Sequence, residues 1–292
     1  MNDLTGSYDW CRQITRIEAK NFYYGFITLP IKKRLAIYAS YAFCRLCDDA
    51  ADENYPVDKK LKLLKDIRGN LSESYAGRPL GPVFTALADT ASSYHIPEEL
   101  YQEIITGVET DLSRNRYSNF DELRSYCYGV ASAVGLICIE ILGYSDPSAK
   151  TYATNLGLAM QLTNIIRDIK EDLGRDRIYI PQDEISRFGY SEDRLIGANM
   201  DQQFLSLMRF QVDRAREYFA DGLKLIPLLP FRARPCPAVL ARLYMRVLDV
   251  IEDRNFNVFD GRISLTGREK LYITARTWMG NLLPVTHPSV TE

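Results

Sequence analysis

The sequence contains only two histidines, His95 and His287, among 292 residues. A Ser-His-Asp or Cys-His-Asn hydrolase needs a histidine beside its nucleophile, and zinc sites draw on histidines or on two pairs of cysteines. The six cysteines include one C-x-x-C pair, Cys44 and Cys47, and most of the six lie in apolar helical stretches. We therefore expect neither a histidine-based hydrolase nor a zinc site, and we interpret the cysteines as buried thiols of a reducing compartment.

The chain also lacks an excess of charge of either sign. It has 36 lysines and arginines against 38 acids, with a formal net charge of −2 and no basic half or tail. This balance argues against nucleic acid as a partner. A P-loop motif and a G-x-G-x-x-G motif are both missing, so the common loops that bind nucleotide phosphates are not expected.

No run of 18 apolar residues occurs, and the first residues do not combine a basic start with an apolar block. We therefore expect no transmembrane segment and no signal peptide. The predicted location is the cytoplasm, with peripheral contact at the inner face of the membrane as an option.

Most of the chain shows helical periodicity, with apolar residues three and four positions apart and little strand-like alternation. Proline and glycine interrupt this pattern at intervals. We predict one all-α domain over residues 1–292, packed around a central cavity or core. The predicted helices lie roughly at 31–53, 58–76, 80–93, 97–112, 120–143, 147–173, 201–228, 235–254 and 267–282, and the polar segment 172–190 is expected to be an irregular loop that covers a site.

The helix predicted at 31–53 ends in a run of acids. Asp48 and Asp52 are four positions apart, so they share one helical face, about 6 Å apart along the axis. Tyr41 and Arg45 fall on the same stripe. The helix thus presents a tyrosine, an arginine and two acids on one side.

A second stretch repeats this spacing more than a hundred residues later. Asn164, Asp168 and Asp172 follow each other at intervals of four, and Gln161 extends the same face. Acid pairs on helices usually belong to a solvated surface. Here both stretches lie among apolar residues and tyrosines, which favours two helices that face each other across a cavity.

Such an arrangement is electrostatically costly. Two carboxylates about 6 Å apart repel by roughly 3 kcal/mol at an effective dielectric constant near 20, so four of them need a bound cation or raised pKa values. Carboxylate and amide oxygens suit Mg²⁺, which keeps water and phosphate oxygens as further ligands. Arg45, Arg167 and Arg177 can bind that phosphate. With apolar side chains around them, these groups suggest a ligand with a diphosphate head and a hydrocarbon tail.

Five segments resemble a known family in their order and spacing. They are FYYGF at 22–26, YAFCRLCDDAADE at 41–53, YCYGVASAVG at 126–135, QLTNIIRDIKED at 161–172 and RDRIYIP at 175–181. Together they resemble the squalene/phytoene synthase family, and most of all its bacterial presqualene diphosphate and squalene-type members. The resemblance covers about residues 15 to 275 and implies an isoprenoid synthase fold.

The resemblance also implies roles for individual residues. The implied metal ligands are Asp48, Asp52, Asn164, Asp168 and Asp172. The residues implied to bind substrate are Phe22, Phe26, Arg45, Gln161, Asn164, Arg167, Arg177 and Arg262. Catalytic roles are implied for Tyr41, Arg45, Asp48, Asp52, Tyr128, Asp168, Asp172 and Tyr244, with the three tyrosines near the reacting carbons.

The family chemistry implied is a Mg²⁺-dependent head-to-head (1′-1) condensation of two prenyl diphosphates. Phe26 matches a position near the bottom of the tail pocket, where bulk favours two C15 farnesyl groups. We therefore expect presqualene diphosphate as product, or squalene if NADPH supplies a hydride. A phytoene synthase that joins two C20 geranylgeranyl diphosphates and a dehydrosqualene synthase are the alternatives.

Two further classes stay open at this point. Terpene cyclases and head-to-tail prenyltransferases share acidic helices and Mg²⁺, but the Y-x-x-x-R-x-x-D-D-x-x-D stripe favours the head-to-head family. A non-catalytic lipid-binding relative would be expected to lose motif acids, and all of them are present here.

Overall fold

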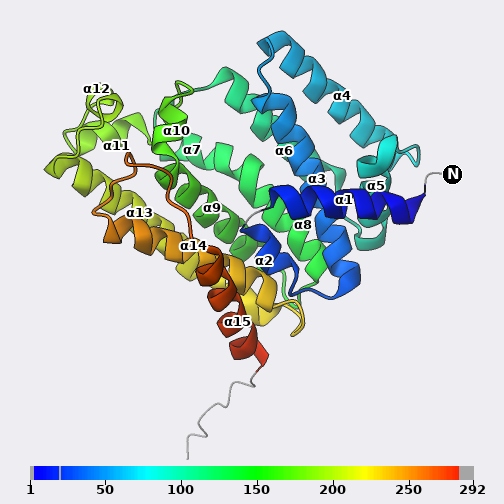
Figure 1. The fold of residues 1–292 in the computed structure, drawn as a ribbon. Coiled ribbons are helices and arrows are strands. Elements are labelled where there is room, and N and C mark those ends of the chain that lie inside the picture. Colours follow the sequence, from blue (N-terminus) through cyan, green and yellow to red (C-terminus); the bar gives the residue numbers. More distant parts are fainter. Residues whose placement is uncertain (1–2, 20, 283–292) are drawn as a thin grey trace, which may run out of the picture.

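Helices make up the whole architecture, and Figure 1 shows them packed around the middle of the molecule. This computed structural model describes residues 3–19 and 21–282, in which no strand forms and a single bridge pairs Arg116 with Ile178. The all-α prediction is confirmed. The elements are α1 (Leu4–Glu18), α2 (Phe22–Phe26), α3 (Ile31–Asp52), α4 (Val57–Tyr75), α5 (Gly81–Tyr94), α6 (Glu98–Ser113), α7 (Phe120–Cys127), η1 (Tyr128–Ser132), α8 (Ala133–Leu142), α9 (Ala149–Arg167), α10 (Ile169–Leu173), α11 (Gln182–Arg187), α12 (Glu192–Ile196), α13 (Gln202–Gly222), η2 (Leu223–Leu228), α14 (Pro235–Asp253) and α15 (Gly267–Leu282).

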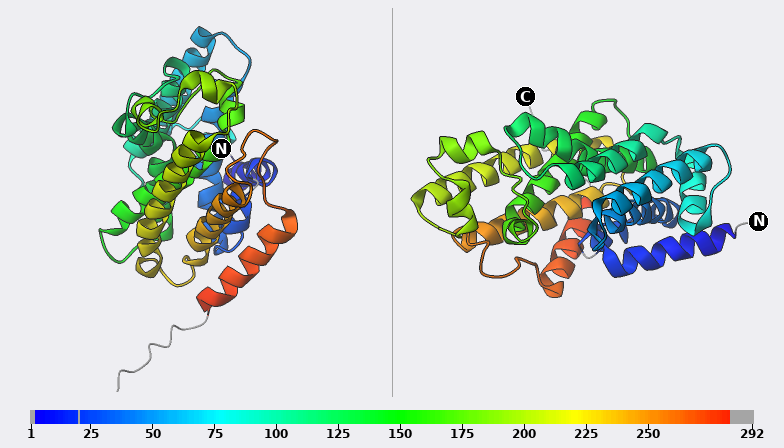
Figure 2. Two further views of the ribbon diagram at one scale, coloured as in Figure 1. Left: turned by 90° about the vertical axis from the view of Figure 1, so that its left-hand side faces the viewer. Right: turned by 90° about the horizontal axis from the view of Figure 1, so that it is seen from above.

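The centre of the fold is formed by α3, α8, α9 and α14. On the outside, α13 runs along α9, α1 and α5 pack on α3, and α15 packs on α14. Figure 2 shows the same helices from two further sides. Buried apolar side chains from Cys11 to Leu265 form one continuous cluster, so the central helices are held by packing on several sides.

The first acidic helix, α3, has clear local signals at both ends. It begins directly after Pro30, whose fixed φ suits a helix start, and it ends where Glu53 returns to extended backbone. Its buried side is made of small and apolar residues, including Ala36, Ala39 and Phe43. The opposite side of α3, which carries Tyr41, Asp48 and Asp52, can therefore face a cavity.

Two long predicted helices are interrupted. The segment predicted as one helix at 120–143 is α7, a π-helical turn η1 and α8. The turn lies where Gly129 meets Gly107 of α6, and a Cβ built on Gly129 would lie 3.0 Å from the Gly107 Cα. This close crossing leaves no room for regular side-chain packing and explains a local change of helix type.

The segment predicted at 147–173 breaks at Asp168, whose backbone (φ −99°, ψ 12°) leaves the helical region between α9 and α10. The segment predicted at 201–228 ends as α13 at Gly222 and continues as the 3₁₀ helix η2, which contains Pro227. In both places one continuous helix was the wrong prediction, and the proline accounts for the second change.

Four short or polar helices were not predicted: α1, α2, α11 and α12. The last two lie in or just after the segment 172–190, which is therefore not wholly irregular. The ends of the predicted domain, residues 1–2 and 283–292, lie outside the described residues.

One stretch, Phe120–Leu142, is long and apolar enough to cross a membrane, with a mean hydropathy of 1.6 over its best window. No such stretch was expected. More than half of that window, 56%, is buried inside the protein, where η1 and α8 contact α6 and α9. Buried core helices have the same length and composition, so this stretch is weak support for a membrane span.

The crossing of α13 and α9 generates a stability prediction. A Cβ added to Gly222 would lie 2.8 Å from the backbone N and Cα of Leu156, so we expect Gly222→Ala to lower the free energy of unfolding by about 1–3 kcal/mol. Gly69 lies on exposed α4 with no atom within 4 Å of its added Cβ, and Gly69→Ala should raise stability by roughly 0.5–1 kcal/mol. Urea denaturation followed by circular dichroism measures both. Equal changes in the free energy of unfolding for the two variants would contradict a close crossing of α13 and α9 at Gly222.

Candidate active site

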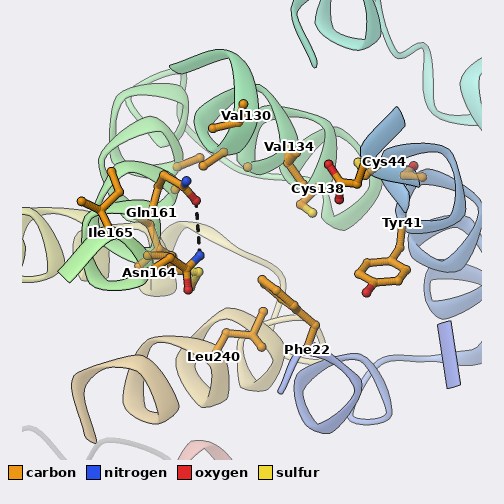
Figure 3. Close-up of a pocket in the computed structure, with 18 of the residues that line it drawn as sticks. Phe22, Tyr41, Cys44, Val130, Val134, Cys138, Gln161, Asn164, Ile165 and Leu240 are labelled. Carbon is orange, nitrogen blue, oxygen red and sulfur yellow. Dashed lines mark hydrogen bonds between the residues drawn. The ribbon is translucent and has the colours of Figure 1, made fainter. Parts of the chain in front are cut away.

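A cavity of about 490 Å³ lies between the central helices. Figure 3 shows Tyr41 projecting from one wall, Gln161 and Asn164 from the facing wall, and Phe22 and Leu240 from a third. These side chains come from α3, α9, α2 and α14. The expected central cavity is therefore present, and it is bounded by helices that are distant in sequence.

The cavity is polar at one end and apolar at the other. Along α3 it extends from Ile37 to Asp52, fifteen residue steps, or about 22 Å of helix axis at 1.5 Å per residue. The deep end is lined by Ile37, Leu142, Leu225, Cys236 and Pro237. At the mouth, α3 and α9 both end, and the carbonyl ends of helices favour positive charge.

Both predicted acidic pairs line this mouth. Asp48 and Asp52 lie on the last turn of α3, and Asp168 and Asp172 lie at the end of α9 and on α10. The two stretches that repeat each other in the sequence thus share one cavity. Our geometric expectation for them is met, although the helical face of the second pair is interrupted at Asp168.

The break at Asp168 has a visible counterpart in its side chain. Arg167 Nε and Nη2 donate to the two carboxylate oxygens of Asp168 at 2.8 and 2.5 Å, and the side chains are only 12% and 18% exposed. Asp172 still donates its backbone N–H to Asp168 O at 2.9 Å. Asp168 and Asp172 therefore stay one helical turn apart, and the Asp168 carboxylate is hydrogen-bonded to Arg167.

The ionisation of the mouth is strongly perturbed. Burial, and next the Asp52 carboxylate, raise the pKa of Asp48 to about 7. Asp48 is open to the cavity, but the protein walls around it still disfavour its charged form. Burial, and next Asp168, raise the pKa of Asp172 to about 7. Without a cation, one acid of each pair therefore binds a proton near neutral pH.

A fifth carboxylate, Asp111 at the end of α6, also lines the mouth. It accepts the hydroxyls of Tyr126 at 2.9 Å and Tyr179 at 2.8 Å, and burial raises its pKa. Arg177 Nη2 donates to the backbone oxygen of Asp111 at 3.0 Å. Sequence reasoning missed Asp111 because no second acid stands four positions before or after it. Tyr126 and Tyr179 lie inside family segments and could have been found there.

Of the four arginines implied to bind substrate, Arg167 and Arg177 line the cavity, together with Arg175. Arg175 crosses the mouth to Asp52 at 3.2 Å. The other two implied arginines, Arg45 and Arg262, do not line the cavity. Arg45 pairs with Asp49 at 2.5 Å and lies 4.0 Å from Glu18, and Arg262 lies 3.5 Å from Glu171. In this conformation their guanidinium groups are held by acids outside the cavity.

The tyrosines also differ in position. Tyr41 lines the cavity, and burial raises its pKa. Tyr244 lies behind the lining, 3% exposed, with its ring 5.8 Å from that of Phe22. Burial raises its pKa, while the neighbouring Arg167 and Asn164 side chains act in the opposite direction. Tyr128 does not line the cavity. It begins the π turn, whereas Tyr126 reaches the mouth.

Aromatic rings form part of the apolar wall. Phe22 and Phe26 stack at 6.0 Å, and Phe26 meets the edges of Tyr38 at 6.3 Å and Tyr41 at 6.0 Å. Cys44 and Cys138 face the same cavity as free thiols, and burial raises the pKa of each. Thiols kept protonated in this way behave as small apolar groups.

The chemistry of the mouth fits a hard cation. Asn164 Oδ1 is buried without a hydrogen-bond partner, while its Nδ2 donates to Gln161 Oε1 at 3.2 Å. An orphaned amide oxygen beside carboxylates is a suitable ligand for Mg²⁺. Across the described part of the chain, no three acidic, histidine or cysteine side chains already converge on one point. Water and ligand oxygens would therefore complete any coordination sphere.

Comparisons with known proteins agree with this geometry. The family profile of squalene/phytoene synthase matches residues 15–269. The phytoene synthase of Arthrospira platensis is 38% identical over 269 residues, 88% of this chain and 87% of the relative. The 15-cis-phytoene synthase of Synechococcus elongatus is 38% identical over 280 residues, 92% of this chain and 91% of the relative.

Among solved structures, a dehydrosqualene synthase in complex with a ligand superimposes with a TM-score of 0.88 at 27% identity, over 95% of this chain and 97% of that one. The similarity therefore extends over nearly the whole fold, including the helices that carry the acidic mouth. On these grounds the chain belongs to the squalene/phytoene synthase family of head-to-head prenyltransferases.

Proposed function

We propose that this enzyme joins two geranylgeranyl diphosphates head to head, as a phytoene synthase, and that it does so with Mg²⁺ at the acidic mouth. The observation that carries the proposal is the placement of Asp48/Asp52 and Asp168/Asp172 at one mouth above one apolar cavity. Diphosphate heads suit that mouth, and prenyl tails suit the cavity beneath it.

The choice of C20 over C15 substrates rests on similarity. The relatives at 38% identity carry the name phytoene synthase, which favours the alternative over our first expectation of farnesyl diphosphate. The position of Phe26 is compatible with this choice. It shares the deep part of the cavity with Ile37, Leu142 and Pro237, so one ring does not set the tail length alone.

Asp48, Asp52, Asn164, Asp168 and Asp172 would hold Mg²⁺ together with phosphate oxygens. When bound, Mg²⁺ would supply positive charge that neutralises the diphosphate as it leaves. The balance of charged side chains at the mouth also calls for added positive charge. Five carboxylates and three guanidinium groups line the cavity, so the fully ionised mouth carries an excess of two negative charges.

The remaining chemistry falls to the protein's own groups. Arg167, Arg175 and Arg177 can bind the diphosphate and stabilise its developing charge. Once the allylic C–O bond of one substrate breaks, the apolar walls keep water from the carbocation. The rings of Phe22 and Tyr41 present aromatic faces to positive charge.

The double bond of the second substrate then attacks the cation, and loss of one proton closes a cyclopropyl diphosphate. Breaking its C–O bond, rearrangement and loss of a second proton give a C40 hydrocarbon with a conjugated triene at its centre, without a reductant. Tyr41 and the departing diphosphate are the two candidate proton acceptors near this cavity. NADPH would be needed only for a product that gains a hydride, as squalene does.

A second candidate is a C15-specific enzyme that makes presqualene diphosphate, dehydrosqualene or squalene. Phe26 favours it through its bulk near the deep end, and so does the fold-level similarity to a dehydrosqualene synthase. Both candidates need the same mouth and differ in how much tail the cavity accepts.

A product assay separates the two candidates. We expect the enzyme with Mg²⁺ to convert geranylgeranyl diphosphate to a C40 hydrocarbon, with or without NADPH, and to prefer it to farnesyl diphosphate in kcat/KM. Mass spectrometry of the extracted products gives the answer. C30 products alone, or a product that changes when NADPH is added, would support the second candidate.

Asp48→Asn tests the acidic mouth. It removes a negative charge without changing side-chain size, so we expect turnover to fall by about 10²-fold or more while helical circular dichroism is retained and the melting temperature stays at or above that of wild type. Asp49→Asn is the matched control, because Asp49 is the adjacent acid and pairs with Arg45 outside the cavity. Parallel losses of helicity and activity in Asp48→Asn would show a structural role instead.

The raised pKa values predict how stability depends on pH. Asp48 and Asp172 keep their protons up to about pH 7 in the folded protein, whereas unfolded aspartates lose theirs near pH 4. Their contribution to stability is thus greatest below pH 4 and declines between about pH 4 and 7. We expect Mg²⁺ to raise the melting temperature more at pH 8 than at pH 6, because protons compete with the cation.

The same measurement on Asp48→Asn should show a smaller difference between the two pH values. An equal Mg²⁺ effect at pH 6 and pH 8 in the wild-type enzyme would contradict cation binding by these acids.

A further inference from the structure

The last helix, α15, exposes more apolar surface than an ordinary surface helix does, although Ile273 packs on the core. Its buried positions are threonines, Thr274 at 7% and Thr277 at 1% exposure. Its solvent side carries large apolar groups that repeat at helical spacing: Leu271, Tyr272, Trp278 and Met279, between 45% and 64% exposed. A surface helix normally buries its apolar stripe, so this stripe indicates a partner outside the described protein.

Cations accompany the exposed stripe. Arg268 and Arg276 lie on the solvent side of α15, and neither forms an ion pair within residues 3–19 and 21–282. The acid of this helix, Glu269, instead accepts the backbone N–H of Thr266 at 2.9 Å and lies 3.9 Å from Arg246. The outer side of α15 thus combines apolar and aromatic groups with positive charge that has no counterion.

A second helix adds to the same side of the molecule. In both views of Figure 2, α1 and α15 lie along one side, which faces the viewer in Figure 1. On α1, Trp10 is 53% and Ile17 is 72% exposed, seven positions apart, and Arg16 beside them has no ion pair in the described chain. Of the two acids flanking them, Asp9 pairs with Arg12 and Glu18 lies 4.0 Å from Arg45.

We propose that this surface, the outer sides of α1 and α15, docks on an anionic lipid bilayer. Trp10 on α1 and Trp278 on α15 are the only tryptophans of the chain, and each is about half exposed. Tryptophan and tyrosine favour the interface between headgroups and hydrocarbon, where one edge of the ring is wet and the body is apolar. Unpaired arginines beside them complement anionic headgroups.

The docking surface lies next to a wall of the cavity. The short helix α2 contacts α14 and α15, and its Phe22 and Phe26 line the cavity from the inside. Ile27, which follows α2, is 38% exposed. A bilayer on this side would place the apolar part of the cavity one thin element away from lipid.

Because α1 and α15 each carry one half-exposed tryptophan, fluorescence is the natural test. The full-length enzyme is mixed with vesicles of phosphatidylglycerol and phosphatidylcholine or of phosphatidylcholine alone, without substrate. We expect a blue shift of tryptophan emission and co-sedimentation with the anionic vesicles, and both should weaken at high salt. Because no turnover is involved, failure here is distinguishable from failure of the proposed reaction.

Matched variants locate the surface. Leu271→Asp/Met279→Asp keeps both tryptophans and should reduce vesicle affinity by about tenfold or more, as should Arg268→Glu/Arg276→Glu. Ile196→Asp changes an equally exposed apolar residue on α12, far from α1 and α15 in Figure 1, and should have no effect. Turnover without vesicles should be unchanged in all three variants.

Several outcomes would overturn the proposal. One is a wild-type enzyme that does not bind anionic vesicles, and another is equal vesicle affinity before and after the Leu271/Met279 substitutions. A third such outcome is a dimer in sedimentation analysis that the same double substitution dissociates, since the stripe would then belong to a second copy of the chain.

Discussion

Like charges held close together at the cavity mouth are the constraint on which the site depends. Five aspartates from α3, α6, α9 and α10 line one opening and only three arginines accompany them. The fold must supply enough packing energy to hold these helices in place against that repulsion. A continuous apolar core packs behind α3, α8 and α9, and burial together with the neighbouring carboxylates raises the pKa values of Asp48 and Asp172.

In the proposed reaction, the same repulsion would favour binding of a cation at the mouth. A site whose acids bind protons near pH 7 can exchange those protons for a divalent cation and an anionic ligand that arrive together. Arg175, which reaches across to Asp52, and Arg177, which is anchored at Asp111, belong to the segment after α10. This segment therefore brings positive charge to acids from two other helices, and it links the first acidic stretch to the second.

Sequence reasoning located the acidic stretches because helical spacing and apolar neighbours are local properties. Asp48, Asp52 and Gln161 line the cavity as that spacing predicts. It failed at the π turn of Tyr128, which lies where Gly129 crosses Gly107 of another helix. It also failed at Asp168, where the side chain pairs with the adjacent Arg167, a local contact that helical spacing does not predict. Asp111 has no neighbouring motif, and only the fold brings it to the mouth.

The length of prenyl tail that the cavity can accept is a further property that sequence reasoning could not settle. Phe26 is one bulky residue near the deep end, and taken alone it predicts a short pocket. In the structure the deep end is bounded by side chains from α3, α8, η2 and α14 as well, so the space available to a tail depends on how four elements pack. Under the proposed function, chain-length specificity would therefore follow from the packing of the cavity floor, and the diphosphate chemistry from the acidic mouth.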